Sequence, residues 1–153
     1  MILLSDIHIG LNKDNQIFHA TTIELFKEIV DVCNKTNDNE IAILGDLFHN
    51  RKVLSQKSLE TAHEVADICK KQKIILVRGN HDTYYNSEAY PNWLSLFAYY
   101  DNIVPVIDDY YMTNKMCFVP WGFNIGDVPV CCEGHARCSH YSVGTPHRVC
   151  QHQ

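Results

Sequence analysis

Three short apolar runs, separated by two stretches of helical periodicity, most constrain how this chain can fold. The runs cover residues 2–4, 41–44 and 74–77. Each is almost continuously hydrophobic, which is typical of strands buried on both faces of a sheet. Because a helical stretch lies between each pair of runs, the order predicts a βαβαβ unit. We therefore expect an α/β fold in which helices pack on a parallel sheet.

The two helical stretches are recognised by apolar residues at steps of three and four, which form one face of a helix. These positions are Ile23, Phe26, Val30 and Cys33 in the first stretch, and Leu59, Ala62, Ala66 and Cys69 in the second. Ser55 or Ser58 is expected to cap the start of the second helix. His19 and His63 lie at the start of the first helix and within the second, so we predict that neither binds a metal.

Composition limits the location and the partners of the chain. Its 153 residues are 46% hydrophobic and 20% charged, as in one soluble domain. No apolar run reaches the ~20 residues of a membrane span, and residues 1–10 lack the features of a signal peptide. We therefore expect a cytoplasmic protein without a membrane partner. Cys33, Cys69 and Cys117 lie in apolar segments and are expected to be buried, reduced thiols.

The formal net charge of −5 bears on nucleic-acid binding. A protein that binds nucleic acid through phosphate contacts alone is usually basic, because cationic side chains must replace the counterions. This chain therefore either has another kind of partner or obtains positive charge from bound metal cations or a partner subunit.

Each predicted strand is followed by side chains that can bind metal ions. The groups are Ser5-Asp6-Ile7-His8, Gly45-Asp46-Leu47-Phe48-His49 and Gly79-Asn80-His81-Asp82. The carboxyl ends of parallel strands meet at one edge of a sheet, so the three groups can converge there. One Asp-x-His pair or one Gly-Asp turn is common by chance, but all three groups in this order predict a site. Carboxylate, imidazole and amide ligands suit a pair of divalent cations that clamps a phosphoryl group during its transfer.

In this order the groups resemble the first three motifs of the calcineurin-like metallophosphoesterases. Three segments, "SDIHIG", "GDLFHNRKVLSQKSLE" and "VRGNHD" with a later "FVPW", are similar to the nuclease subunit of SbcD/Mre-type DNA repair complexes, especially phage versions. The similarity covers about residues 1–126, as the N-terminal part of a metallophosphoesterase sandwich that is incomplete at its C-terminus.

The resemblance implies a site that holds two divalent cations, typically Mn²⁺. Asp6 and His8 would bind the first cation, Asp46 would bridge both, and Asn80 would bind the second. The implied activity is metal-dependent hydrolysis of phosphodiesters in DNA, weak or absent in a truncated chain. The implied partners are an SbcC-like coiled-coil ATPase and a second copy of the chain. The alternatives are a phosphoesterase acting on phosphoproteins or small nucleotides, and a remnant without catalysis.

The resemblance also implies the catalytic residues. His81 would contact the scissile phosphate and help to protonate the leaving group, and Asp82 would orient His81. The chain departs from the pattern at His49, where the nucleases usually have Asp. His49 is expected to face solvent or to act outside the ligand shell. Arg51 and Lys52 either contact a DNA backbone or belong to an ordinary solvated loop.

Beyond the third motif group, a short helix is expected over residues 93–100, followed by strands in "NIVPVIDD" and "KMCFVPW". Residues 127–153 then differ in composition. Their last 24 residues contain four Cys and four His but no Leu, Ile, Phe, Met or Trp. A segment of this composition cannot bury a core, so we predict a partial nuclease domain at 1–126 and a disordered tail at 127–153.

Three interpretations of this tail remain open. It is an added zinc site, a divergent end of the metal site with His135 as a ligand, or non-native sequence that follows a frame shift or truncation after about Gly126. The sudden loss of large aliphatic side chains favours the third. The eight side chains available to a zinc ion are Cys131, Cys132, His135, Cys138, His140, His147, Cys150 and His152.

Overall fold

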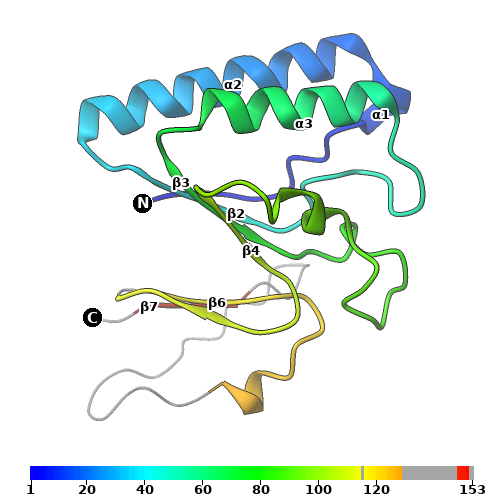
Figure 1. Ribbon diagram of the computed structural model, residues 1–153, viewed down its shortest axis with the longest axis vertical. Coiled ribbons are helices and arrows are strands. Elements are labelled where there is room, and N and C mark those ends of the chain that lie inside the picture. The colour runs from blue at the N-terminus through cyan, green and yellow to red at the C-terminus, as the bar shows by residue number, and fades with distance from the viewer. Residues whose placement is uncertain (115, 129–147, 152–153) are drawn as a thin grey trace.

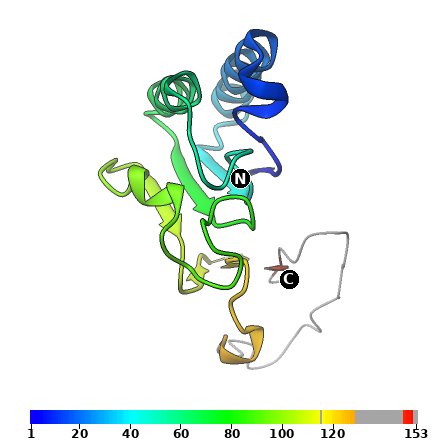
Figure 2. The same cartoon turned by 90° about the vertical axis from the view of Figure 1, so that its right-hand side faces the viewer.

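The fold has three layers. The computed structural model describes residues 1–114, 116–128 and 148–151. Helices α2 (Gln16–Thr36) and α3 (Gln56–Ile68) lie side by side on one face of a four-stranded sheet. A three-stranded sheet lies on the other face (Figure 1). Figure 2 shows the two helices nearly end on, above the four-stranded sheet.

The four-stranded sheet is parallel, in the order β1-β2-β3-β4. Its strands are β1 (Ile2–Leu4), β2 (Glu40–Leu44), β3 (Lys73–Val77) and β4 (Ile103–Val106). The predicted βαβαβ unit is confirmed, with α2 and α3 as the connections and β4 as a fourth parallel strand. All four strands therefore end at the same edge of the sheet, on the side where α3 begins (Figure 1).

Side-chain alternation along the strands divides the core in two. One face of the sheet packs under the helices. There Phe26, Ala62 and Ile43 belong to one hydrophobic cluster, and all three are nearly inaccessible to solvent. The opposite face buries Ile75 against Phe118 of the second sheet. This two-sided burial explains why β2 and β3 are apolar at almost every position.

The predicted state of the three separated cysteines is confirmed. Cys33, Cys69 and Cys117 are buried and form no disulfide. Burial raises the pKa of the Cys69 thiol to about 12, so this side chain stays a neutral, apolar packing group at physiological pH.

The second sheet is antiparallel, in the order β5 (Tyr111–Met112), β6 (Met116–Val119) and β7 (Arg148–Gln151). The sequence predicted disorder throughout 127–153, but β7 lies within that segment and pairs with β6. Backbone groups along the edge of β6 can bind another strand whatever its side chains are, so composition does not reveal this pairing. Of the eight side chains proposed for zinc, Cys150 belongs to β7, opposite Cys117. The other seven, including His135, fall on residues 129–147 and 152–153, outside the described residues.

Two short elements differ from expectation. The predicted helix over 93–100 is a 3-10 helix, η1 (Trp93–Phe97), continued by i→i+3 bonds from the amides of Ala98 and Tyr100. Its tight winding limits its length, since side chains three residues apart eclipse one another. A second 3-10 turn, η2 (Ile125–Asp127), follows β6. Among the described residues, no helix has both the length and the apolar character needed to cross a bilayer.

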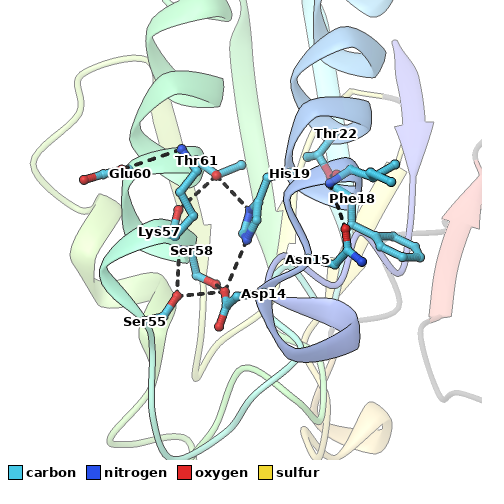
Figure 3. Close-up of polar contacts among 11 residues, drawn as sticks. Asp14, Asn15, Phe18, His19, Thr22, Ser55, Lys57, Ser58, Glu60 and Thr61 are labelled. Atoms are coloured by element: carbon cyan, nitrogen blue, oxygen red, sulfur yellow. Dashed lines mark hydrogen bonds and ion pairs between the residues drawn. The ribbon is translucent and has the colours of Figure 1, made fainter.

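A polar network holds the segment after β1 against the start of α3 (Figure 3). Oδ1 of Asp14, at the end of the short helix α1 (Leu11–Asp14), accepts hydrogen bonds from Ser55 Oγ (2.7 Å) and Ser58 Oγ (2.5 Å). His19 Nε2 lies 3.2 Å from the same oxygen, and His19 Nδ1 lies 2.9 Å from Thr61 Oγ1. His19 is buried and its two ring nitrogens are used in this way, in agreement with its assignment as a non-ligand.

The same network caps α3. Ser55 accepts a hydrogen bond from Ser58 N at the start of the helix, which confirms one of the two predicted caps. Gly10, with a φ of 91°, packs so closely on α3 that an added Cβ would lie 2.6 Å from Ser58 Oγ. The segment that follows β1 is thus fixed to the helix that follows β2.

We predict that Asp14→Ala lowers the free energy of unfolding by about 1–3 kcal/mol at pH 7, because two hydroxyl donors lose their acceptor. The Ser58 hydrogen bond above all holds the pKa of Asp14 below its ordinary value of 3.8. Its contribution is therefore present above pH ~4 and is lost as the pH falls further, through the folded pKa. Urea unfolding at pH 7 and pH 3 measures this.

The control is Asp31→Ala, which removes an exposed carboxylate from α2 and should change stability by less than about 0.5 kcal/mol. Equal destabilisation by the two variants, or an Asp14→Ala effect that grows on acidification, contradicts this account of the network.

Candidate metal centre

The loops that follow β1 and β2 run side by side beyond the ends of their strands. His8 N donates to Asp46 O (2.9 Å), and Ile9 N donates to Leu47 O (2.8 Å). His49 N then donates to Ile9 O (2.9 Å). The parallel pairing of the sheet therefore continues into both loops, so the side chains they carry lie at fixed positions relative to one another.

Three predicted ligands have a left-handed backbone. The φ angles of Asp6, His8 and Asp46 are 56°, 51° and 53°. This region is uncommon for residues other than glycine and costs free energy, which the surrounding hydrogen bonds must offset. Such conformations concentrate at functional sites. Here they occur on alternate residues of the β1 loop and at the tip of β2.

The predicted ligands of both loops converge. Asp6, His8 and Asp46 each offer a ligand atom, and these atoms all lie within 4.8 Å of one another. Asp46 is 2% exposed and lies at the centre of the site. With the Asn80 amide turned so that its nitrogen faces the carboxylate, that nitrogen lies 3.1 Å from Asp46 Oδ2. The four residues predicted to bind metal thus lie together at one edge of the sheet.

Three imidazoles form a second group in the same place. Ligand atoms of His8, His49 and His81 lie within 4.8 Å of one another, and the ring centroids are 5.1–5.8 Å apart. The sequence favoured a solvent-facing or outer role for His49. The structure instead places its ring against both other histidines, because the β2 loop stays paired with the β1 loop as far as His49. The one available signal was its position three residues after Asp46, in the same strand-end motif.

The His81 ring is oriented by the backbone of the β2 loop. Its Nδ1 lies 2.7 Å from His49 O, and its own amide donates to Asp46 Oδ1 (2.8 Å). A carbonyl oxygen only accepts hydrogen bonds, so Nδ1 carries the proton. His81 Nε2 is therefore the nitrogen that can exchange a proton with a bound group.

Asp82 has a different position from the one the sequence predicted. Its carboxylate is fully buried and accepts hydrogen bonds from the amides of Gly79 (2.9 Å), Asp46 (2.9 Å) and Phe48 (3.2 Å). It therefore joins the β2 and β3 loops and is not the hydrogen-bond partner of the His81 ring. Consecutive side chains leave a tight turn in different directions, which explains the separation. Desolvation raises the pKa of Asp82 to about 6, against the opposing effect of these amides.

Arg78, which sequence reasoning did not single out, fixes the other side of the β3 loop. It is 4% exposed and donates to the carbonyls of Ile107 (2.5 Å) and Glu88 (3.3 Å), and also to that of Trp121. Burial lowers the pKa of this guanidinium, which the charge of Asp108 partly offsets. Through these three hydrogen bonds, the Arg78 guanidinium joins the end of β3 to the segments that follow β4 and β6 and to the 83–90 loop.

The donor set fits divalent metal ions. Burial is the main cause that lowers the pKa of His8, which favours the neutral imidazole that binds metals. Nδ1 of His8 and Nδ1 of His49 are buried, and neither has a hydrogen-bond partner within the described part of the chain. A polar nitrogen left in this way calls for an ion or water. Asp6, His8, Asp46 and Asn80 would hold the metals, with His49 and His81 beside them.

We predict that Gly79→Ala disrupts the centre. An added Cβ would lie 2.2 Å from Asp46 Oδ1 and 2.3 Å from Asp46 N, so the two loops would have to separate. We expect a loss of about 3 kcal/mol in the free energy of unfolding, by overpacking, together with weakened metal binding. Thermal unfolding with and without Mn²⁺ measures both effects.

Gly126→Ala is the matched control, because the nearest atom to its added Cβ is 3.4 Å away. If Gly79→Ala keeps the stability and the Mn²⁺-induced shift of the wild type, the close contact between the two loops is not needed for the site.

Similarity to known proteins extends over most of the chain. It is 29% identical to exonuclease subunit 1 of Enterobacteria phage T4 over 103 residues, 65% of this chain and 30% of that protein. It is 33% identical to the DNA double-strand break repair protein Mre11 of Archaeoglobus fulgidus over 82 residues, 52% of this chain and 18% of that protein. The chain thus spans less than a third of the length of these curated relatives.

Among solved structures, nuclease MPE of Pseudomonas putida matches with a TM-score of 0.46 and 24% identity, over 73% of this chain and 50% of that one. The family model described as calcineurin-like phosphoesterase matches residues 1–148, which include every strand tip of the metal centre and the start of β7. On that match, which agrees with the parallel sheet and the ligands at its edge, the chain belongs to the calcineurin-like phosphoesterase family.

Proposed function

We propose that this chain forms the metal-binding half of a DNA nuclease that hydrolyses phosphodiester bonds with two divalent cations. The observation that carries the proposal is the convergence of Asp6, His8, Asp46 and Asn80 with His81 at one sheet edge. The names of the two relatives, an exonuclease subunit and a double-strand break repair protein, support DNA as the substrate class.

The residues divide the chemistry between them. When bound, two divalent cations neutralise the phosphate and lower the pKa of a water molecule. His81, protonated at Nδ1 by its hydrogen bond to the His49 carbonyl, presents Nε2 to the phosphate and, in its doubly protonated form, gives a proton to the leaving oxygen. Asp82 keeps the backbone of Gly79 and Asp46 in place, so it acts on the reaction only through the loops that it joins.

We also propose Mn²⁺ as the cation and a coiled-coil ATPase as a partner. The carboxylate oxygens of Asp6 and Asp46 and the amide oxygen of Asn80 are hard ligands that suit Mn²⁺. The relative from phage T4 is named as a subunit, which supports assembly with another protein. Bound metal cations would also explain how a chain with a net charge of −5 can bind DNA, because they supply positive charge next to the phosphodiester.

Metal binding is the first test. We expect the 153-residue chain to bind Mn²⁺ in a calorimetric titration. Asp46→Ala should weaken that binding at least about tenfold, because Asp46 is the proposed ligand of both cations. Asp31→Ala, an exposed carboxylate on α2, should bind as the wild type does. Equal binding by all three proteins, or by none of them, removes the basis of the proposal.

Activity is the second test. We expect any Mn²⁺-dependent degradation of linear DNA to fall at least about 100-fold in His81→Ala, through the loss of a general acid. His63→Ala, which removes an exposed α3 imidazole bonded to Tyr100, should not change the rate. Hydrolysis of phosphomonoesters without DNA cleavage would instead favour a phosphatase, and equal DNA cleavage by wild type and His81→Ala would refute the role of His81.

A further inference from the structure

An exposed aromatic and basic surface lies beside the metal centre. We call it the Tyr84 surface and define it as Arg51, Lys52, Tyr84 and Tyr85. Tyr84 and Tyr85 are 38% and 51% exposed, and their ring centroids are 4.7 Å apart in an edge-to-face arrangement. Lys52 Nζ lies 5.6 Å from the centroid of the Tyr84 ring. The site thus presents two aromatic rings and an ammonium group to solvent at one place.

Arg51 connects this surface to the metal centre. Its Nη1 donates to Asn86 Oδ1 (3.0 Å), in the loop that carries the two tyrosines. Its Nη2 lies 2.8 Å from the oxygen of Asn80, in the amide orientation that also faces Asp46. One guanidinium therefore contacts both Asn80, a predicted metal ligand, and Asn86, in the loop of the two tyrosines. A nucleotide bound to the tyrosines would thus lie next to the metal centre.

The tyrosine loop is held at its base. Thr83 forms a bridge with Asn92, and Tyr84 N donates to Pro91 O (3.0 Å). Asp82 and Thr83, immediately before the rings, are fully buried. The rings therefore stand on a fixed backbone, and binding to them has a smaller cost in conformational entropy than binding to a free loop.

The charges of this surface oppose those of the whole chain. The net charge is −5, yet neither Arg51 nor Lys52 forms an ion pair with any residue that the structure describes. Single exposed tyrosines are ordinary on protein surfaces. Rings combined with unpaired cations are the arrangement that binds single-stranded nucleic acid, because bases stack on the rings while the cations contact phosphates.

We propose that the Tyr84 surface binds an unpaired nucleotide of the strand that enters the metal centre. A base stacks on Tyr84 or Tyr85, and Lys52 and Arg51 contact the neighbouring phosphates. The surface thereby selects single-stranded or frayed ends over fully paired duplex. This inference rests on the proposed function, since it assumes that the strand held on the tyrosines is the one hydrolysed.

Binding without metal tests the inference separately from catalysis. The 153-residue chain is titrated, in EDTA, into a fluorescein-labelled single-stranded oligonucleotide and into a blunt hairpin duplex, and anisotropy is measured. We expect Tyr84→Ala with Tyr85→Ala to weaken single-strand binding roughly tenfold or more and duplex binding less than about threefold. The double Phe variant should bind within about twofold of the wild type, because it retains both rings.

Tyr99→Ala is the matched control, because Tyr99 is 92% exposed and follows η1 away from this loop. Lys52→Ala should lower the slope of log affinity against log salt by about 0.7, as expected for one lost phosphate contact, whereas Lys71→Ala should not. An oligonucleotide with one abasic position should bind more weakly to the wild type but not to the double Ala variant.

The outcomes separate the two proposals. Equal single-strand binding by wild type and the double Ala variant, equal loss in the Phe variant, or no binding by the wild type overturns the inference. DNA cleavage that depends on His81 but not on the tyrosines also overturns it, while the proposed function stands. Ring-dependent binding of single strands supports the surface as a binding site even where the chain hydrolyses no DNA, because this binding is measured without metal.

Discussion

The buried carboxylate of Asp82 is the interaction on which the rest of the centre depends. One side chain accepts hydrogen bonds from amides on both the β2 loop and the β3 loop. No solvent reaches it, so unpaired amides at these positions would each cost free energy that water could not recover. The carboxylate therefore fixes the distance between the loop of Asp46 and the loop of Asn80, which carry two of the proposed metal ligands.

Close packing and strain follow from that junction. Gly79 approaches Asp46 so closely that no larger residue fits, and Asp46 itself has a left-handed backbone. Arg78 holds the opposite side of the same loop through backbone carbonyls. Unfavourable conformations at Asp6, His8 and Asp46 persist because hydrogen bonds from two neighbouring loops determine them. Hydrogen bonds within the protein therefore set the positions of these three donor side chains.

Much of this architecture followed from local patterns. The apolar runs at 2–4, 41–44 and 74–77 predicted parallel strands, and Ser55 was one of two predicted caps. The convergence of Asp6, His8, Asp46 and Asn80 followed from the same argument, because parallel strands end at one edge. Strand β7 did not follow, since its pairing with β6 uses backbone groups that leave no mark in composition. The left-handed φ angles were equally invisible, because Asp and His are enriched in that region but usually lie outside it, so residue type does not mark the positions that adopt it.

The sequence by itself determined which chemical groups reach the edge of the sheet, because apolar periodicity and the order of strands are local properties of the chain. Only the tertiary structure decided how those groups are used. Asp82 binds three amides and leaves the orientation of His81 to the His49 carbonyl. His49 joins the imidazole group, and Arg51 reaches Asn80. Apart from the hydrogen bond between Gly79 and Asp82, these contacts cross between loops that are about 30–40 residues apart in sequence, where the path of the backbone decides which groups meet.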